Sequence, residues 1–141
     1  MTAAFRLRLR VRYGECDAQG IVFNARWGDY VDLATSEYTR ALFGGIDAGL
    51  DWRLVKQTIE WRAPARYDDV LDIQVRTLRV GTTSFALATE FTRGDTELAT
   101  AETVYVVVDA AAGTTRPVPD AARATLERGA PGVVVDQTGI G

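Results

Sequence analysis

The segment from Tyr13 to Asn24 is where this sequence could do chemistry. It holds a carboxylate, Asp17, seven residues before Asn24, where a long helix is expected to begin. The first N–H groups of a helix have no partner within it and can bind a developing negative charge. A carboxylate beside them would pair a general base or nucleophile with an oxyanion site. The segment therefore predicts a site of that kind, with Asp17 as its acid.

Three neighbours of Asp17 have plainer interpretations. Glu15 is interpreted as a solvated charge, because the strand-exit pattern points it differently from Asp17. Cys16 has no His or Lys nearby to lower its pKa, so we interpret it as a packing thiol and not a nucleophile. Gly20 would let the loop turn tightly toward the helix, although an ordinary turn glycine fits equally well. Without its surroundings, Asp17 itself could be a solvated loop acid or a helix cap.

The composition excludes several classes of chemistry. The 141 residues include no His, which removes Ser-His-Asp hydrolysis, Cys-His proteolysis and most zinc sites. Lys56 is the only lysine among 16 basic residues, which form no basic run, and the net charge is −3, so nucleic acid binding is disfavoured. The single cysteine fits a reducing compartment. We therefore expect chemistry by carboxylates, hydroxyls, amides or Arg, with no metal or redox cofactor.

Two elements are expected to position the segment. Residues 5–13 alternate apolar side chains with Arg, which predicts a half-buried strand whose Arg face is solvated or lies at an interface. From Asn24 the apolar spacing changes to three and four, and this stripe predicts a core helix that ends at Gly44 and Gly45. Asn24 is the expected N-cap of that helix.

The remainder of the chain predicts a sheet around this helix. Four strand-like segments are separated by turn residues, at about 53–62, 70–80, 83–93 and 97–108. A short helix is expected at 120–128, and residues 129–141 are expected to form a flexible tail or to order only against a neighbour. The predicted fold class is α+β, a single domain over residues 1–141 with a curved antiparallel sheet of about five strands wrapped around one long helix.

The patterns also predict a cytoplasmic protein. The longest apolar run, residues 104–108, is far too short to span a bilayer, so no membrane association is expected. The first residues lack the apolar core of a signal peptide.

Several motifs follow one another along the chain in a specific order. The first is Val11-x-Tyr13-x-x-x-Asp17-x-x-Gly20-Ile21-Val22-Phe23-Asn24, which leads into an aromatic-rich helix. It is followed by the strand end and turn at residues 62–69, by Ser84-Phe85, and by Arg116-Pro117-Val118-Pro119. In this order the motifs resemble the hotdog-fold acyl-CoA thioesterases, in the 4-hydroxybenzoyl-CoA thioesterase and YbgC-like group. The resemblance covers about residues 5–128 and implies the hotdog fold.

The resemblance also implies roles for two residues of the first motif. Asp17 matches the catalytic carboxylate of the family, and Asn24 matches the helix-start residue whose backbone N–H faces the thioester carbonyl. A thioester is already activated, so one carboxylate and one preorganised donor could suffice. Asp17 could form a mixed anhydride or activate water, and both mechanisms remain open. Family members often have Tyr or His where Asn24 stands, which leaves the backbone N–H unchanged.

The substrate-binding residues that the resemblance implies are less specific. Gly20 and Trp27 lie close to the first motif in the sequence, and Arg62, Arg66 and Arg79 could bind phosphate because a guanidinium forms paired hydrogen bonds. Core packing is the alternative for Trp27 and the other helical aromatics, and an ordinary surface position is the alternative for each Arg. The expected substrate is an acyl-CoA or an acyl group on an acyl carrier protein.

The resemblance further implies a homo-oligomer. The acyl pocket of the family lies between two subunits, so a dimer or a dimer of dimers, that is a homotetramer, is expected. A hotdog module that binds acyl thioesters without hydrolysing them is the alternative function. A hotdog dehydratase is disfavoured because the usual His is absent.

Overall fold

The structure is a computed structural model that describes residues 4–45 and 50–139. Its two helices and five long strands lie where the sequence predicts them, with bounds that differ by a few residues. In chain order the elements are β1 (Phe5–Arg10), the 3-10 turn η1 (Tyr13–Glu15), α1 (Arg26–Phe43), β2 (Asp51–Trp61), β3 (Val70–Val80), β4 (Ser84–Arg93), β5 (Thr96–Asp109), β6 (Thr114–Thr115), α2 (Asp120–Arg128) and β7 (Val134–Gln137).

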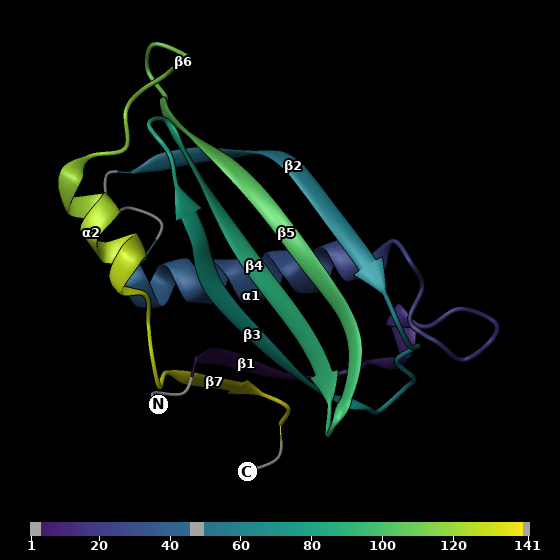
Figure 1. Ribbon diagram of the computed structural model, residues 1–141. Helices are drawn as coiled ribbons and strands as arrows, with labels where there is room; N and C mark the ends of the chain where they lie inside the picture. The colour runs from purple at the N-terminus through teal and green to yellow at the C-terminus, as the bar shows by residue number, and fades with distance from the viewer. Residues whose placement is uncertain (1–3, 46–49, 140–141) are drawn as a thin grey trace.

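The strands form one curved sheet in the order β2-β5-β4-β3-β1-β7, with the short β6 paired to β5. Neighbouring strands are antiparallel, apart from β7, which runs parallel to β1. Figure 1 shows the sheet curving around α1, with α2 at one end of the sheet. The predicted α+β architecture is confirmed. The short strands β6 and β7 raise the strand count above the predicted five.

The core lies between α1 and the concave face of the sheet. Alternate side chains are buried along the first half of β3, as the period of two predicts, and along β4, where Ala86 is buried in addition. The helix buries most of the predicted stripe, namely Trp27, Tyr30, Val31, Ala34 and Tyr38, while Ala41 near its end is exposed and Leu42 is half-buried. Within the described ranges, no helix combines the length and the apolar character that crossing a bilayer requires.

The sequence predicted the C-terminal end of α1 correctly and its N-terminal end wrongly. Gly44 adopts the left-handed conformation with φ +82°, and its N–H donates to the carbonyl of Arg40, so the predicted stop is confirmed. The predicted N-cap is wrong, because the helix begins at Arg26 and Ala25 precedes it without a side-chain cap. Asn24 instead contributes its carbonyl, which accepts from Trp27 N–H at 3.3 Å.

The C-terminal segment corrects the expectation of a flexible tail. Residues Val134–Gln137 form β7 beside β1, and Arg8 Nη1 pairs with Asp136 Oδ2 at 3.3 Å. Arg10 Nε also donates to the carbonyl of Thr138 at 2.9 Å. The Arg face of β1 therefore binds acidic and carbonyl groups of its own chain. Residues 140–141, the end of the predicted tail, lie outside the described residues.

Strand β2 is an edge strand with an exposed apolar surface. Among the strands that the structure describes it pairs with β5 alone, and a bulge at Val55 interrupts the register. Leu54 and Val55 are 50% and 59% exposed, and Trp61 at the end of the strand is also exposed. A long apolar edge is a ready template for pairing with another chain.

Candidate active site

The loop between η1 and α1 folds back on itself as a narrow hairpin. Cys16 pairs with Val22 in an antiparallel bridge, and Asp17 N–H donates to the carbonyl of Ile21 at 2.8 Å. Gly20 closes the turn, since its N–H donates to the carbonyl of Asp17 at 3.0 Å and its φ is +77°. A side chain is strained at that φ, so the loop needs glycine there.

Asp17 lies on this hairpin with its carboxylate only partly engaged. Oδ1 accepts from the backbone N–H of Gln19 at 2.8 Å, and the side chain is half-buried. In residues 4–45 and 50–139, no cation forms an ion pair with Asp17. The carboxylate therefore keeps acceptor capacity for a water molecule or can approach an electrophile itself.

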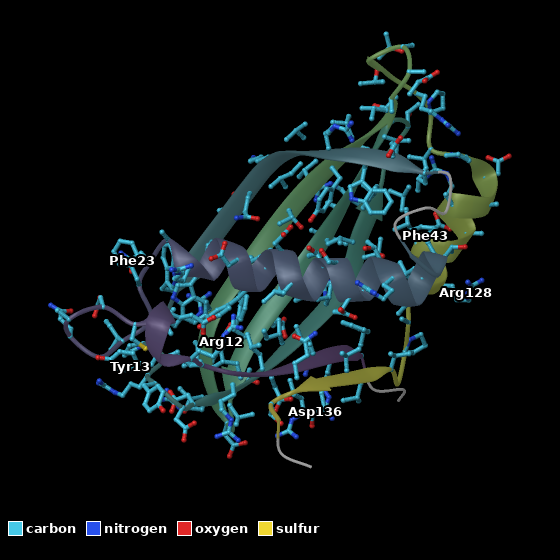
Figure 2. All side chains as sticks on the ribbon, turned by 180° about the vertical axis from the view of Figure 1, so that it is seen from behind. Arg12, Tyr13, Phe23, Phe43, Arg128 and Asp136 are labelled. Atoms are coloured by element: carbon cyan, nitrogen blue, oxygen red, sulfur yellow. The ribbon has the colours of Figure 1, made fainter. Side chains whose placement is uncertain are left out.

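The entrance of α1 offers unpaired backbone donors. Phe23 N–H donates to the carbonyl of Glu15 at 3.0 Å, which fastens the second arm of the hairpin to the first. The next two N–H groups, of Asn24 and Ala25, take part in none of the hydrogen bonds found in the described part of the chain. They stand at the positive end of the helix dipole and can stabilise an oxyanion. Figure 2 shows Phe23 at this end of α1 and Phe43 at the other.

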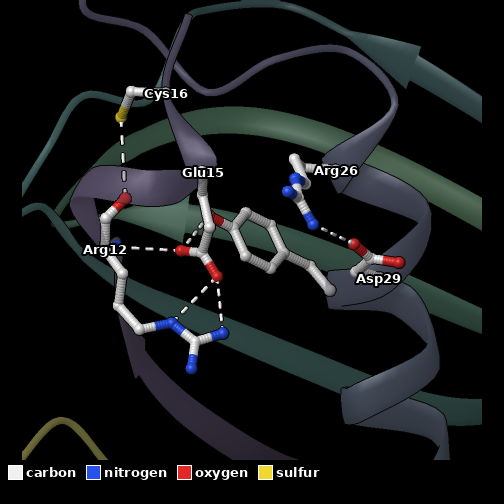
Figure 3. Close-up of polar contacts among 6 residues, drawn as sticks. Arg12, Glu15, Cys16, Arg26 and Asp29 are labelled. Atoms are coloured by element: carbon white, nitrogen blue, oxygen red, sulfur yellow. Dashed lines mark hydrogen bonds and ion pairs between the residues drawn. The ribbon is translucent and has the colours of Figure 1, made fainter.

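Glu15 is the residue of this segment whose surroundings the sequence reasoning misjudged. It was expected to be solvated, but its side chain is buried, and both carboxylate oxygens are hydrogen-bonded. Figure 3 shows the guanidinium of Arg12 facing it. Burial acts to raise the pKa of Glu15, but the hydrogen bonds from Arg12 and Tyr30 outweigh it and lower that pKa below its ordinary value. The spacing of three between Arg12 and Glu15 was the available sequence signal.

Cys16 is not an activated nucleophile, as the sequence predicted. Burial raises its pKa, and the negative charges of Glu15, Asp17 and Asp69 raise it further. Its Sγ donates to the carbonyl of Arg12 at 3.8 Å. The thiol packs against the core.

A cavity of about 450 Å³ lies between α1 and β2. Its wall on α1 includes Asp32, about 9 Å along the helix axis from Arg26 at 1.5 Å per residue. Trp52 of β2 and Tyr105 of β5 also line it. Asp17 is not part of its lining, so within one chain this cavity and the hairpin are separate.

The comparison with known proteins identifies the family. The sequence model of the thioesterase-like superfamily matches residues 11–126, a range that includes the hairpin, α1 and the four long strands β2 to β5. The chain belongs to the thioesterase-like superfamily. It has the hotdog fold of that family, and it is a thioester hydrolase.

Individual relatives agree with this assignment. The acyl-CoA thioester hydrolase YbgC of Escherichia coli O6:H1 is 33% identical over 113 residues, which cover 77% of this chain and 84% of YbgC. A hypothetical protein of Aquifex aeolicus has a solved structure with a TM-score of 0.79 and 27% identity, covering 86% of this chain and 98% of that one. A probable thioesterase of Bartonella henselae aligns with a TM-score of 0.71 and 25% identity, over 83% and 99% of the two chains.

Of the three arginines suggested for this thioesterase, the structure brings one to the hairpin. Arg66 pairs with Ile21 in an antiparallel bridge, and its side chain forms no ion pair in the described residues. Arg62 pairs with Glu97 at 3.5 Å. Arg79 lies near the other end of β3, roughly 30 Å from Val70 along the strand at 3.3 Å per residue.

Trp27 is part of the core in this chain. It is 2% exposed, and its ring makes edge contacts with Tyr30 and Phe91 at centroid distances of 5.7 and 5.1 Å. The sequence left core packing open as the alternative to substrate binding, and within one chain Trp27 packs in the core. Its indole fixes the first turn of α1 against β4.

Proposed function

We propose that this thioesterase hydrolyses an acyl-CoA to a free acid and CoA, with Asp17 as the reacting carboxylate. The observation that carries the proposal is the hairpin itself. Among residues 4–45 and 50–139, the carboxylate on its first arm has no cation partner, and its second arm leads to the N–H groups of Asn24 and Ala25, which have no acceptor there. The YbgC relative is named as an acyl-CoA thioester hydrolase, which supports the substrate class.

The reaction needs few groups. The N–H of Asn24 polarises the thioester carbonyl and stabilises the oxyanion that forms on its oxygen. Asp17 either removes a proton from the attacking water or attacks the carbonyl carbon itself to give a mixed anhydride. In both routes the C–S bond breaks and CoA leaves as its thiolate, which takes up a proton. A single turnover in ¹⁸O-water can separate the two routes. If an anhydride forms and water attacks its Asp17 carbonyl carbon, the label enters Asp17, whereas direct attack of water on the thioester labels only the acid product.

A panel of acyl thioesters tests the proposal. Short-chain, long-chain and aromatic acyl-CoAs are compared with the same acyl groups on acyl carrier protein, and thiol release is followed with a colour reagent. We expect turnover of at least one acyl-CoA. Turnover of carrier-protein substrates alone would show that the substrate is an acyl group on acyl carrier protein and not an acyl-CoA. Binding without turnover of any thioester would establish the alternative function, a non-catalytic binding module.

Arg66 is proposed to contact the phosphates of CoA. Replacing Arg66 by Gln should raise KM for the acyl-CoA about threefold to tenfold with little change in kcat, since a partly exposed hydrogen bond to a charged group contributes roughly 1 kcal/mol. The matched control is Arg79→Gln, because Arg79 is already paired with Glu102 at 2.9 Å. Steady-state kinetics with acyl-CoA and with acyl-pantetheine, which lacks the nucleotide, measure the effect. An equal rise in KM for both substrates would contradict a phosphate contact.

The active unit is proposed to be a dimer joined through β2. The edge strand is eleven residues long and exposes apolar side chains on an unpaired edge, which a second copy could cover by two-fold pairing. The cavity beside α1 is partly lined by β2, so a second subunit at this edge would also enclose it. This supports the expectation that the acyl pocket forms between subunits, and pairs of such dimers would give the tetramer.

Charging this edge should dissociate the dimer. The double variant Leu54→Lys, Val55→Lys is expected to shift the protein to single chains while leaving its unfolding transition nearly unchanged, because both side chains are half exposed or more in one chain. Light scattering coupled to gel filtration measures the mass. Val134→Lys on β7, the opposite edge, is the control and should not change it. Dissociation by the control alone would place the contact at β7 instead.

A further inference from the structure

A buried carboxylate stands two residues before Asp17 with every oxygen occupied. Glu15 is 8% exposed. Its Oε1 accepts from Arg12 N–H at 2.8 Å and from Tyr30 Oη at 2.9 Å, and its Oε2 accepts from Arg12 Nε at 2.9 Å and from an Arg12 terminal nitrogen at 2.6 Å. Burying a charge is costly unless it is fully paired, so such a group calls for a role that an exposed residue could not fill.

The contacts of Glu15 join the two ends of the catalytic hairpin. Its side chain links η1 to Tyr30 in the second turn of α1, a contact between residues fifteen apart. Its backbone carbonyl accepts from Phe23 N–H at 3.0 Å, one residue before Asn24. Asp17 follows Glu15 by two residues on the first arm, opposite Ile21 of the second arm. A shift of Glu15 would therefore move the carboxylate and the oxyanion donors relative to each other.

We propose that Glu15, held by Tyr30 and Arg12, is a positioning residue that sets the distance between the Asp17 carboxylate and the amides at the entrance of α1. This inference rests on the proposed function, in which those two groups act on one carbonyl. The geometry requires the carboxylate form of Glu15, because all four of its hydrogen bonds are accepted and none is donated. A misplacement of reacting groups by about 1 Å can cost on the order of 100-fold in rate.

The alternative is that Glu15 only stabilises the fold. The helix offers a matched pair of variants to separate the two roles. Tyr30→Phe and Tyr38→Phe each remove one buried phenol hydroxyl from the same face of α1 and each break one hydrogen bond, to Glu15 at 2.9 Å and to Thr77 at 2.8 Å. Only the first hydroxyl touches the hairpin. A purely structural role would make the two variants alike.

The experiment measures kcat, KM and the unfolding midpoint for wild type, Tyr30→Phe, Tyr38→Phe and Glu15→Gln. We expect Tyr30→Phe to lower kcat about tenfold, equivalent to about 1.4 kcal/mol of barrier, with KM nearly unchanged. Glu15→Gln should lower kcat about 100-fold, because an amide nitrogen would face donors and loosen both arms. Tyr38→Phe should keep the wild-type kcat. Equal loss in both tyrosine variants, or full activity in Glu15→Gln, would overturn the proposal.

A second measurement keeps the inference separate from the proposed reaction. Amide hydrogen exchange of the peptide covering residues 16–25 should be faster in Tyr30→Phe and Glu15→Gln than in wild type and unchanged in Tyr38→Phe. If the wild type hydrolyses no thioester, the proposed function fails, and this exchange still decides whether Glu15 holds the hairpin. Unchanged exchange in both hairpin variants would refute the positioning role even in an active enzyme.

Discussion

Replacing Asp17 by Asn is expected to lower kcat by about 100-fold to 10,000-fold while the protein stays folded, because the amide cannot act as a base or form an anhydride. The fold should tolerate the change. The one hydrogen bond that the Asp17 side chain accepts, from Gln19 N–H, can equally be accepted by the Asn carbonyl oxygen. The measurement is thiol release from the best acyl-CoA of the panel, at saturating substrate, with circular dichroism as the check on folding.

The matched control is Asp29→Asn. Asp29 lies in the first turn of α1 and is exposed, with its carboxylate 3.3 Å from Arg26. It contributes negative charge to the same end of the helix without belonging to the hairpin. We expect its removal to leave kcat within about twofold, since the field of one exposed charge is strongly screened. If Asp17→Asn keeps the wild-type rate, Asp17 is not the reacting carboxylate.

The sequence predicted the parts of the fold that depend on local periodicity. Alternate residues of β4 and of the first half of β3 are buried because one face of each strand points to the core, and Ala86 is the exception on β4. The stripe from Trp27 to Tyr38 is buried for the same reason. The left-handed Gly20 and Gly44 also follow from local backbone requirements. These features needed no knowledge of distant contacts.

The features that the sequence did not predict depend on distant contacts. Glu15 is buried because Tyr30 reaches it from the next element, and its own neighbours in sequence do not reveal that. The strand β7 forms because residues 134–137 pair with β1, more than 120 residues earlier in the chain. A run of three valines after Gly132 is too short to specify such a partner by itself.

The arginine candidates show the same limit at the proposed CoA site. Guanidinium chemistry suits phosphate, and the sequence could not separate the three positions. The register of the sheet separates them, because Arg79 faces Glu102 while Arg66 lies beside Ile21. The choice of Arg66 as the phosphate contact therefore depends on the fold and stays a prediction until its KM effect is measured.

The second large effect is expected on stability. Phe91→Ala should lower the free energy of unfolding by about 3 to 5 kcal/mol, because Phe91 is 0% exposed and its removal leaves a void beneath the indole of Trp27. A domain of this size has roughly 5 to 15 kcal/mol of stability in total, so the variant should lose a large share of its stability and unfold at a clearly lower denaturant concentration. Denaturant titration followed by tryptophan fluorescence measures the change.

The matched control for this truncation is Phe23→Ala, which removes the same side chain from an exposed position. Phe23 is 51% exposed and does not belong to the core, so its removal should change the free energy of unfolding by about 0.5 kcal/mol or less. The Phe91 variant should also lose activity at temperatures where it is still largely folded, since Trp27 packs the first turn of α1 on Phe91 and that turn carries the amides proposed to bind the oxyanion. A destabilised Phe91 variant with an undiminished kcat per folded molecule would show that the entrance of α1 is held by the hairpin alone, without support from β4.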